Sequence, residues 1–86
     1  MSEQTIWPER AFHWRVKRGL LELDVLFERF MNRGFAALSQ KELLVFQRLL
    51  QKNDMLLQTW LVFEQGLETA LSDERALIHK ILAVKR

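Results

Sequence analysis

The sequence has no cysteine, one proline and three isolated glycines among its 86 residues. Without cysteine there is no disulfide, no thiolate metal ligand and no cysteine nucleophile. Isolated glycines exclude a glycine-rich phosphate loop. The two histidines, His13 and His79, stand far apart and outside any metal-binding pattern, so we predict neither a metal site nor an enzyme.

Long apolar runs are also missing. No stretch approaches the roughly 20 apolar residues that a membrane span needs. The first residues, 1–5, lack both the basic-then-apolar order of a signal peptide and the arginine-rich character of a transit peptide. We therefore expect a cytoplasmic protein without membrane insertion; a matrix protein whose presequence has been removed is the alternative.

The composition is that of a folded protein. Hydrophobic residues make up 49% and charged residues 28%, and the net charge is only +2. A chain of this length forms one domain, so we predict a single helical domain over residues 1–86, with residues 1–7 as a flexible arm. The small positive charge does not by itself indicate nucleic-acid binding.

Apolar residues recur with helical spacing and never alternate with period two over a useful length. This pattern predicts an all-α bundle of four or five short helices, at about 8–18, 20–33, 40–52, 55–65 and 73–84. Ser39 and Glu42 form a capping box, and Asn53 or Asp54 caps the next helix. In the first helix we expect Ala11, Phe12 and Val16 to be buried, with Trp7 or Trp14 closing an edge of the core. The other helices are expected to bury Leu23, Leu26, Phe27, Phe30, Met31, Leu43, Phe46, Leu49, Leu50, Leu57, Trp60, Leu61, Leu77, Ile78, Ile81 and Leu82.

The segment 17–24 breaks local rules. Gly19 costs a helix roughly 1 kcal/mol relative to alanine, and Asp24 is a poor helix former. On helical spacing Arg18 and Glu22 are four residues apart and face the same way, which predicts an ion pair beside a glycine. Such departures at one place indicate a function, so we interpret the segment as a contact surface where another backbone approaches Gly19.

A nucleic-acid interface is the competing interpretation of the first helix. That helix is the most basic part of the chain and carries aromatic residues that stack on bases. Acidic residues intrude and no helix-turn-helix signature is present, so a solvated face with core aromatics is the better reading. The residues that favour nucleic-acid binding are Trp7, Arg10, His13, Trp14, Arg15, Lys17 and Arg18. The acidic residues that argue against it are Glu9, Glu22 and Asp24.

The motif Arg18-Gly19-x-x-Glu22-x-Asp24 resembles the RGxxE signature of the FAD assembly factor family. A second block, Phe46-x-x-Leu49-Leu50-x-x-x-Asp54-x-x-Leu57-x-x-Trp60-Leu61, is similar to the family's pattern through its third and fourth helices. The resemblance covers about residues 9–83. Family members often have Arg-Arg before the glycine, whereas this chain has Lys17-Arg18, which keeps the charge but loses one planar fork.

The resemblance implies an assembly factor that binds the flavoprotein subunit of succinate dehydrogenase and promotes covalent attachment of FAD to a histidine of that subunit. The flavoprotein of fumarate reductase is a second expected client. FAD would belong to the client, so no cofactor of its own is expected, and the free protein would be a monomer. An antitoxin-like or other protein-interaction role is the alternative. The residues assigned to partner binding are Trp14, Lys17, Arg18, Gly19, Glu22 and Asp24.

Overall fold

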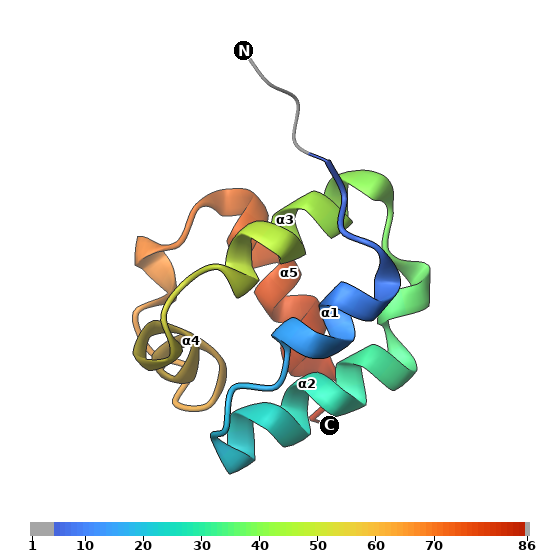
Figure 1. The fold of residues 1–86 in the computed structure, drawn as a ribbon. Coiled ribbons are helices and arrows are strands. Elements are labelled where there is room, and N and C mark those ends of the chain that lie inside the picture. The colour runs from blue at the N-terminus through green and yellow to red at the C-terminus, as the bar shows by residue number, and fades with distance from the viewer. Residues whose placement is uncertain (1–4, 86) are drawn as a thin grey trace.

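The computed structural model describes residues 5–85, and every regular element in this range is a helix. The five α-helices are α1 (Glu9–Arg15), α2 (Leu21–Arg33), α3 (Gln40–Leu50), α4 (Asp54–Leu61) and α5 (Ser72–Ala83). Short 3-10 turns at Phe35–Ala37 and Leu67–Thr69 lie in the connections before α3 and α5. The predicted all-α fold is confirmed (Figure 1).

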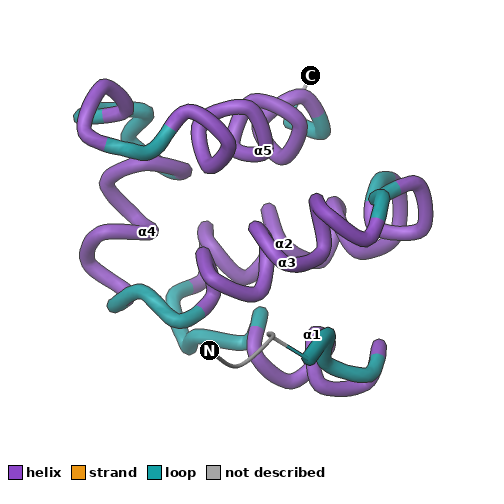
Figure 2. Tube along the Cα trace, turned by 90° about the horizontal axis from the view of Figure 1, so that it is seen from above, coloured by secondary structure: helices purple, strands orange, loops and turns teal. Residues whose placement is uncertain are grey.

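The helices form three layers. Figure 2 shows α2 and α3 at one level, with α5 on one side of them and α1 on the other. Helix α4 stands at the flank in both views, and α5 packs against α2, α3 and α4. Helix α1 therefore forms one outer layer of the protein, and α5 forms the other.

The core lies where the apolar periodicity places it. All of the residues expected to be buried are buried except Ala11 and Leu43, which are half-buried. Phe46 is at the centre of an aromatic cluster, with ring centroids 5.5 Å from Phe12 and 5.4 Å from Phe30. Phe12 brings α1 into this core, because its ring is fully buried while most of α1 remains exposed.

The predicted caps of α3 and α4 are present, whereas Ser72, which the sequence suggests as a cap of the last helix, is the first residue of α5 and follows the N-cap residue Leu71. The Ser39 hydroxyl accepts from the Glu42 amide at 3.1 Å, and the Glu42 carboxylate accepts from the Ser39 amide at 2.9 Å. Asn53, rather than Asp54, caps α4 by accepting from the Leu56 amide.

Two helices end three or more residues earlier than the sequence pattern predicts. Helix α1 stops at Arg15 and not at Arg18, and α4 stops at Leu61, four residues short of the predicted end at 65. After α4 the backbone turns through Glu64 and Gly66, which have φ angles of +54° and +71°. These left-handed conformations are incompatible with a continuing right-handed helix.

The segment that we expected to be part of a flexible arm makes defined contacts at its end. The buried amide side chain of Gln47 accepts from the Trp7 amide at 2.8 Å and donates to the Thr5 carbonyl at 2.9 Å. The Trp7 ring packs on Phe12, with ring centroids 5.3 Å apart. Residues 1–4 of the expected arm lie outside the described residues.

Ion pairs join α3 to α5. The buried carboxylate of Glu74 accepts from Arg48 Nε at 3.0 Å and lies 3.5 Å from Lys52 Nζ. Arg48 also donates to Asp73 at 2.7 Å, and this hydrogen bond lowers the pKa of the Asp73 carboxyl and raises the pKa of Arg48.

Within the described range, no helix combines the length and apolar character needed to cross a bilayer.

Candidate partner-binding site

The connection from α1 to α2 is a tight turn rather than a helix. Helix α1 closes with the Val16 amide donating to the Phe12 carbonyl at 3.0 Å. Gly19 then has a φ of +82°, a region that side-chain-bearing residues rarely adopt. Gly19 therefore separates the two helices, as its low helix propensity indicated.

Asp24 anchors this turn from inside α2. Its carboxylate accepts from the backbone amides of Arg18 at 2.8 Å and Gly19 at 3.0 Å, one on each oxygen. A carboxylate near a helix start is also favoured by the helix dipole. The poor helix former at position 24 therefore has a local structural task, which is to fix the conformation around Gly19.

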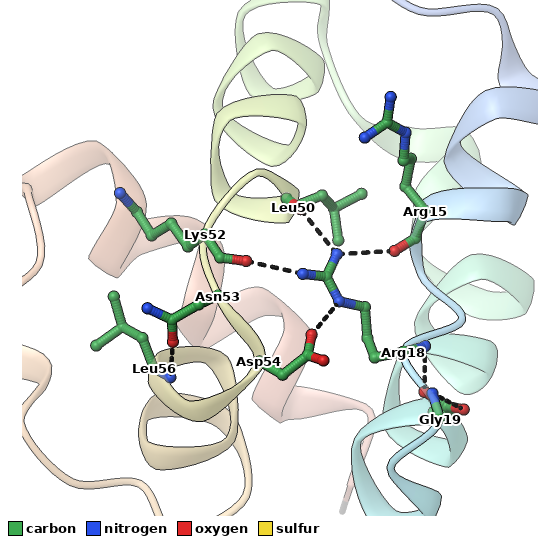
Figure 3. A network of polar contacts seen from close by, with 9 residues as sticks. Arg15, Arg18, Gly19, Leu50, Lys52, Asn53, Asp54 and Leu56 are labelled. Atoms are coloured by element: carbon green, nitrogen blue, oxygen red, sulfur yellow. Dashed lines mark hydrogen bonds and ion pairs between the residues drawn. The ribbon is translucent and has the colours of Figure 1, made fainter.

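The guanidinium of Arg18 points into the protein and not into solvent (Figure 3). It donates to Asp54 Oδ1 through Nε at 2.7 Å, to the carbonyls of Arg15 and Leu50 through Nη1 at 3.0 and 2.7 Å, and to the Lys52 carbonyl through Nη2 at 2.7 Å. Only 14% of the side chain is exposed. The cation thus satisfies carbonyls at the C-terminal ends of α1 and α3, where the helix dipole favours positive charge.

The predicted ion pair between Arg18 and Glu22 is wrong. Arg18 lies in the turn before α2, so the two residues do not share a helix face. The Arg18 guanidinium is bonded to Asp54 instead, across 36 positions of sequence. Glu22 stands exposed on the first turn of α2 and is not among the partners of Arg18.

Four of the six predicted residues face solvent around the turn, and Glu22 is one of them. The Trp14 side chain is 76% exposed, Lys17 is exposed, and a Cβ built on Gly19 would meet nothing within 4 Å. Trp7 differs from Trp14, because it packs on Phe12 and lies under the Arg15 guanidinium at 4.9 Å. The site therefore has exposed groups, Trp14, Lys17, Gly19 and Glu22, and supporting groups, Arg18 and Asp24.

A hollow of about 580 Å³ lies beside the turn, between α1 and α2. Val16 and Met31, both buried in the protein core, contribute apolar lining. Lys17 and His13 supply basic groups from the α1 side, whereas α2 supplies carboxylates. Open space at Gly19 and mixed charge make this surface suited to a protein partner. Over residues 5–85, no three His, Asp or Glu side chains are grouped as a metal site would require.

Sequence reasoning missed the residues that hold the turn in place. The sequence predicts a capping role for Asn53 or Asp54 and includes Asp54 in the second sequence block, but it does not indicate the hydrogen bond between Asp54 and Arg18. The carbonyls of Leu50 and Lys52 leave no side-chain signal at all. The short connection from Leu50 to Asp54 indicates in the sequence only that one helix ends and the next begins there.

Comparison with known proteins agrees with the motif. Residues 10–85 match the model of a protein family described as flavinator of succinate dehydrogenase. The chain belongs to this family. Proteins named FAD assembly factor SdhE are similar to it in Idiomarina loihiensis, with 39% identity over 78% of this chain and 74% of the relative, and in Coxiella burnetii, with 38% identity over 84% and 85%. No solved structure matches.

The match to the flavinator family includes the turn between α1 and α2. The matched residues include all of α1 except its first residue, the whole of α2 and the Gly19 turn between them. In this member the arginine of the RGxxE signature is an internal clamp, while the glycine and glutamate lie on the surface. The signature therefore combines groups that support the turn with groups that it exposes.

Proposed function

We propose that this protein binds the flavoprotein subunit of succinate dehydrogenase and promotes the covalent attachment of FAD to it. The observation that carries this proposal is the match of residues 10–85 to the flavinator family. The relatives named FAD assembly factor, which are 38–39% identical over most of both chains, support the same role.

Binding would take place on the exposed side of the turn between α1 and α2. Gly19 would let a backbone segment of the flavoprotein approach closely, since no atom lies within 4 Å of the space where a Cβ would be. Trp14 would supply a large aromatic contact, the kind of residue that dominates many protein interfaces. Lys17 and Glu22 would supply polar contacts at the edge.

Arg18 and Asp24 would contribute indirectly. Arg18 ties the turn to the carbonyl ends of α1 and α3, and Asp24 holds the two amides of the turn. Both residues would act by keeping the Gly19 turn in one conformation before the partner arrives, which lowers the entropy cost of binding.

The protein would act without catalytic groups of its own. FAD and the histidine that it becomes attached to both belong to the flavoprotein, so the assembly factor would contribute orientation of the client's reacting groups. The proposal places the protein in the cytoplasm, as a monomer that meets the flavoprotein before the latter joins its iron–sulfur partner. The fumarate reductase flavoprotein would be a second client.

The test compares covalent flavin on the flavoprotein in cells that lack this protein, in cells with the wild type, and in cells with Trp14→Ala, Lys17→Glu or Glu22→Ala. Covalent flavin is measured as in-gel fluorescence after denaturation. We expect a loss in the deletion strain and a partial loss in the exposed variants. Arg33→Glu, on the exposed far end of α2, is the matched control and should behave as the wild type.

Each result has a separate meaning. Unchanged flavin fluorescence in the deletion strain would rule out the proposed function. Reduced fluorescence in the deletion strain, with all three exposed variants at the wild-type level, would keep the function and move the binding surface elsewhere. Binding of the purified protein to nucleic acid that weakens steeply with salt would support the competing interpretation of α1.

A further inference from the structure

A second hollow of about 490 Å³ lies along α2, on the side toward the end of α4 and the end of the chain. We call it the α2 groove, and its lining residues are Leu21, Glu22, Val25, Leu26, Arg29, Val62 and Lys85. The aliphatic side chains are the majority, and three charged residues stand among them. None of the groove residues except Glu22 belongs to the predicted site.

Leu21 is the least explained residue of the groove. Its side chain is 80% exposed although it is the first residue of α2, where a polar or acidic residue suits the unpaired amides and the helix dipole. Val25, one helical turn further, is also exposed, and Arg29 follows after another turn. The spacing i, i+4, i+8 places these three residues in one row along α2.

The groove continues the proposed binding surface. Glu22 lines it, and Leu21 is only two residues beyond Gly19. Protein interfaces of this kind have an apolar centre with a polar rim. The surface around Gly19 supplies polar groups, one exposed tryptophan and the buried apolar lining of its hollow, and the α2 groove adds the exposed aliphatic side chains of Leu21 and Val25.

The two basic residues of the α2 groove indicate which charged group its occupant carries. Lys85 Nζ is engaged within the protein, donating to the Leu61 carbonyl at 2.7 Å and lying 3.3 Å from Glu64. Arg29, in contrast, is exposed and its guanidinium has no hydrogen-bond partner among residues 5–85. A carboxylate is the group that an arginine fork binds best.

We infer that the α2 groove binds an apolar side chain of the flavoprotein subunit, with a neighbouring carboxylate of that subunit on Arg29. This inference rests on the proposed function and extends its surface beyond the signature residues. Leu21 and Val25 are the apolar contacts, and Arg29 gives the bound segment its direction along α2.

The experiment is a titration of the flavin-free flavoprotein subunit with the full chain carrying Leu21→Ser. The control is Met55→Ser, because Met55 is a 74% exposed apolar residue at the start of α4. Burial of one leucine side chain corresponds to about a tenfold change in affinity or more, so Leu21→Ser should raise the Kd at least about tenfold while Met55→Ser leaves it unchanged. Melting temperatures of both variants should equal that of the wild type.

A charge-reversal variant tests whether Arg29 binds a carboxylate of the flavoprotein subunit. Arg29→Glu should raise the Kd about tenfold or more, and Arg33→Glu, one turn further on α2, should not. The difference between Arg29→Glu and the wild type should shrink at high salt. Equal affinities of the Arg29→Glu and Arg33→Glu variants would show that Arg29 does not bind a carboxylate of the flavoprotein subunit.

The outcomes separate this inference from the proposed function. If the wild type binds and Leu21→Ser binds equally well, the α2 groove is not part of the interface, although the function stands. If the wild type does not bind and its deletion leaves flavin attachment unchanged, the function fails and the inference with it. If sedimentation shows a dimer that Leu21→Ser abolishes while the client's Kd is unchanged, the occupant is a second copy and the inference is overturned.

Discussion

Gly19 has a conformational reason to be glycine in addition to any contact with a partner. Its φ of +82° lies where a Cβ meets backbone repulsion, while the space beyond it is open. The sequence alone predicts that another backbone approaches this glycine closely. The two explanations are separable, because asparagine tolerates left-handed backbone better than other side chains do.

We predict that Gly19→Val destabilises the protein by about 1–2 kcal/mol, whereas Gly19→Asn costs clearly less. The measurement is urea unfolding followed by circular dichroism. If a partner backbone also approaches position 19, Gly19→Asn should support less covalent flavin than the wild type despite its near-normal stability. Full flavin attachment with Gly19→Asn would show that the glycine serves the turn alone.

At the scale of elements, one side chain connects three helices. Arg18 in the turn after α1 bonds to the last carbonyl of α1, to the end of α3 and to the first residue of α4. The carbonyls at helix ends have no partner within their own helix, so the guanidinium supplies donors that the backbone lacks. Lysine cannot replace it, because one ammonium cannot reach all of these acceptors in the fork's geometry.

We predict that Arg18→Ala lowers the free energy of unfolding by about 2–4 kcal/mol, since it removes hydrogen bonds to a charged group and leaves half-buried carbonyls unpaired. Arg18→Lys should recover only part of this loss. Urea unfolding is the measurement, and Lys17→Ala, at the exposed neighbouring position, is the control and should change stability by less than about 0.5 kcal/mol. Stability of Arg18→Ala equal to that of the control would contradict the clamp.

At the scale of the whole molecule, α5 is held to α3 by ion pairs near both ends of α3. Asp73 bonds to Arg48 on one side, and Glu42, the capping-box residue, bonds to Lys80 on the other. Hydrogen bonds from these cations lower the pKa of both carboxyl groups. The folded state therefore binds these protons less readily than the unfolded chain does.

Stability should consequently fall with acid. A carboxyl group whose pKa is lowered in the folded state contributes stability at neutral pH, and this contribution is lost as the pH drops below about 4 and through the lowered pKa. We predict that Asp73→Asn is less stable than the wild type at pH 7 and that the difference narrows toward pH 3. Urea unfolding at pH 7, 5 and 3 measures the difference in the free energy of unfolding between Asp73→Asn and the wild type.

The control for this acid effect is Glu68→Gln, because the Glu68 carboxylate is exposed and has no hydrogen bond within residues 5–85. Glu68→Gln should follow the wild-type curve at each pH. A stability difference between Asp73→Asn and the wild type that stays constant from pH 7 to pH 3 would show that the Asp73 carboxylate contributes nothing that depends on pH.

The sequence by itself determined the fold class, most of the core and the capping box of α3, and it narrowed the cap of α4 to Asn53 or Asp54. Apolar spacing within one helix decides which face is buried, and the Ser39–Glu42 box is complete within four residues, so both are readable locally. The family motif was equally local, because Arg18, Gly19, Glu22 and Asp24 lie within seven positions of the chain.

Only the tertiary structure decided what the motif residues contact. Arg18 pairs with Asp54, and Gln47 holds the backbone of Trp7, across 36 and 40 positions of sequence. These bonds depend on which helix ends meet in space, and backbone carbonyls carry no side-chain signature that marks them. The periodic pattern also continued α1 through Arg18, because it registers apolar spacing and not the φ of Gly19. The same packing turns Trp7 inward and leaves Trp14 exposed, a choice that two tryptophans near one short helix do not reveal.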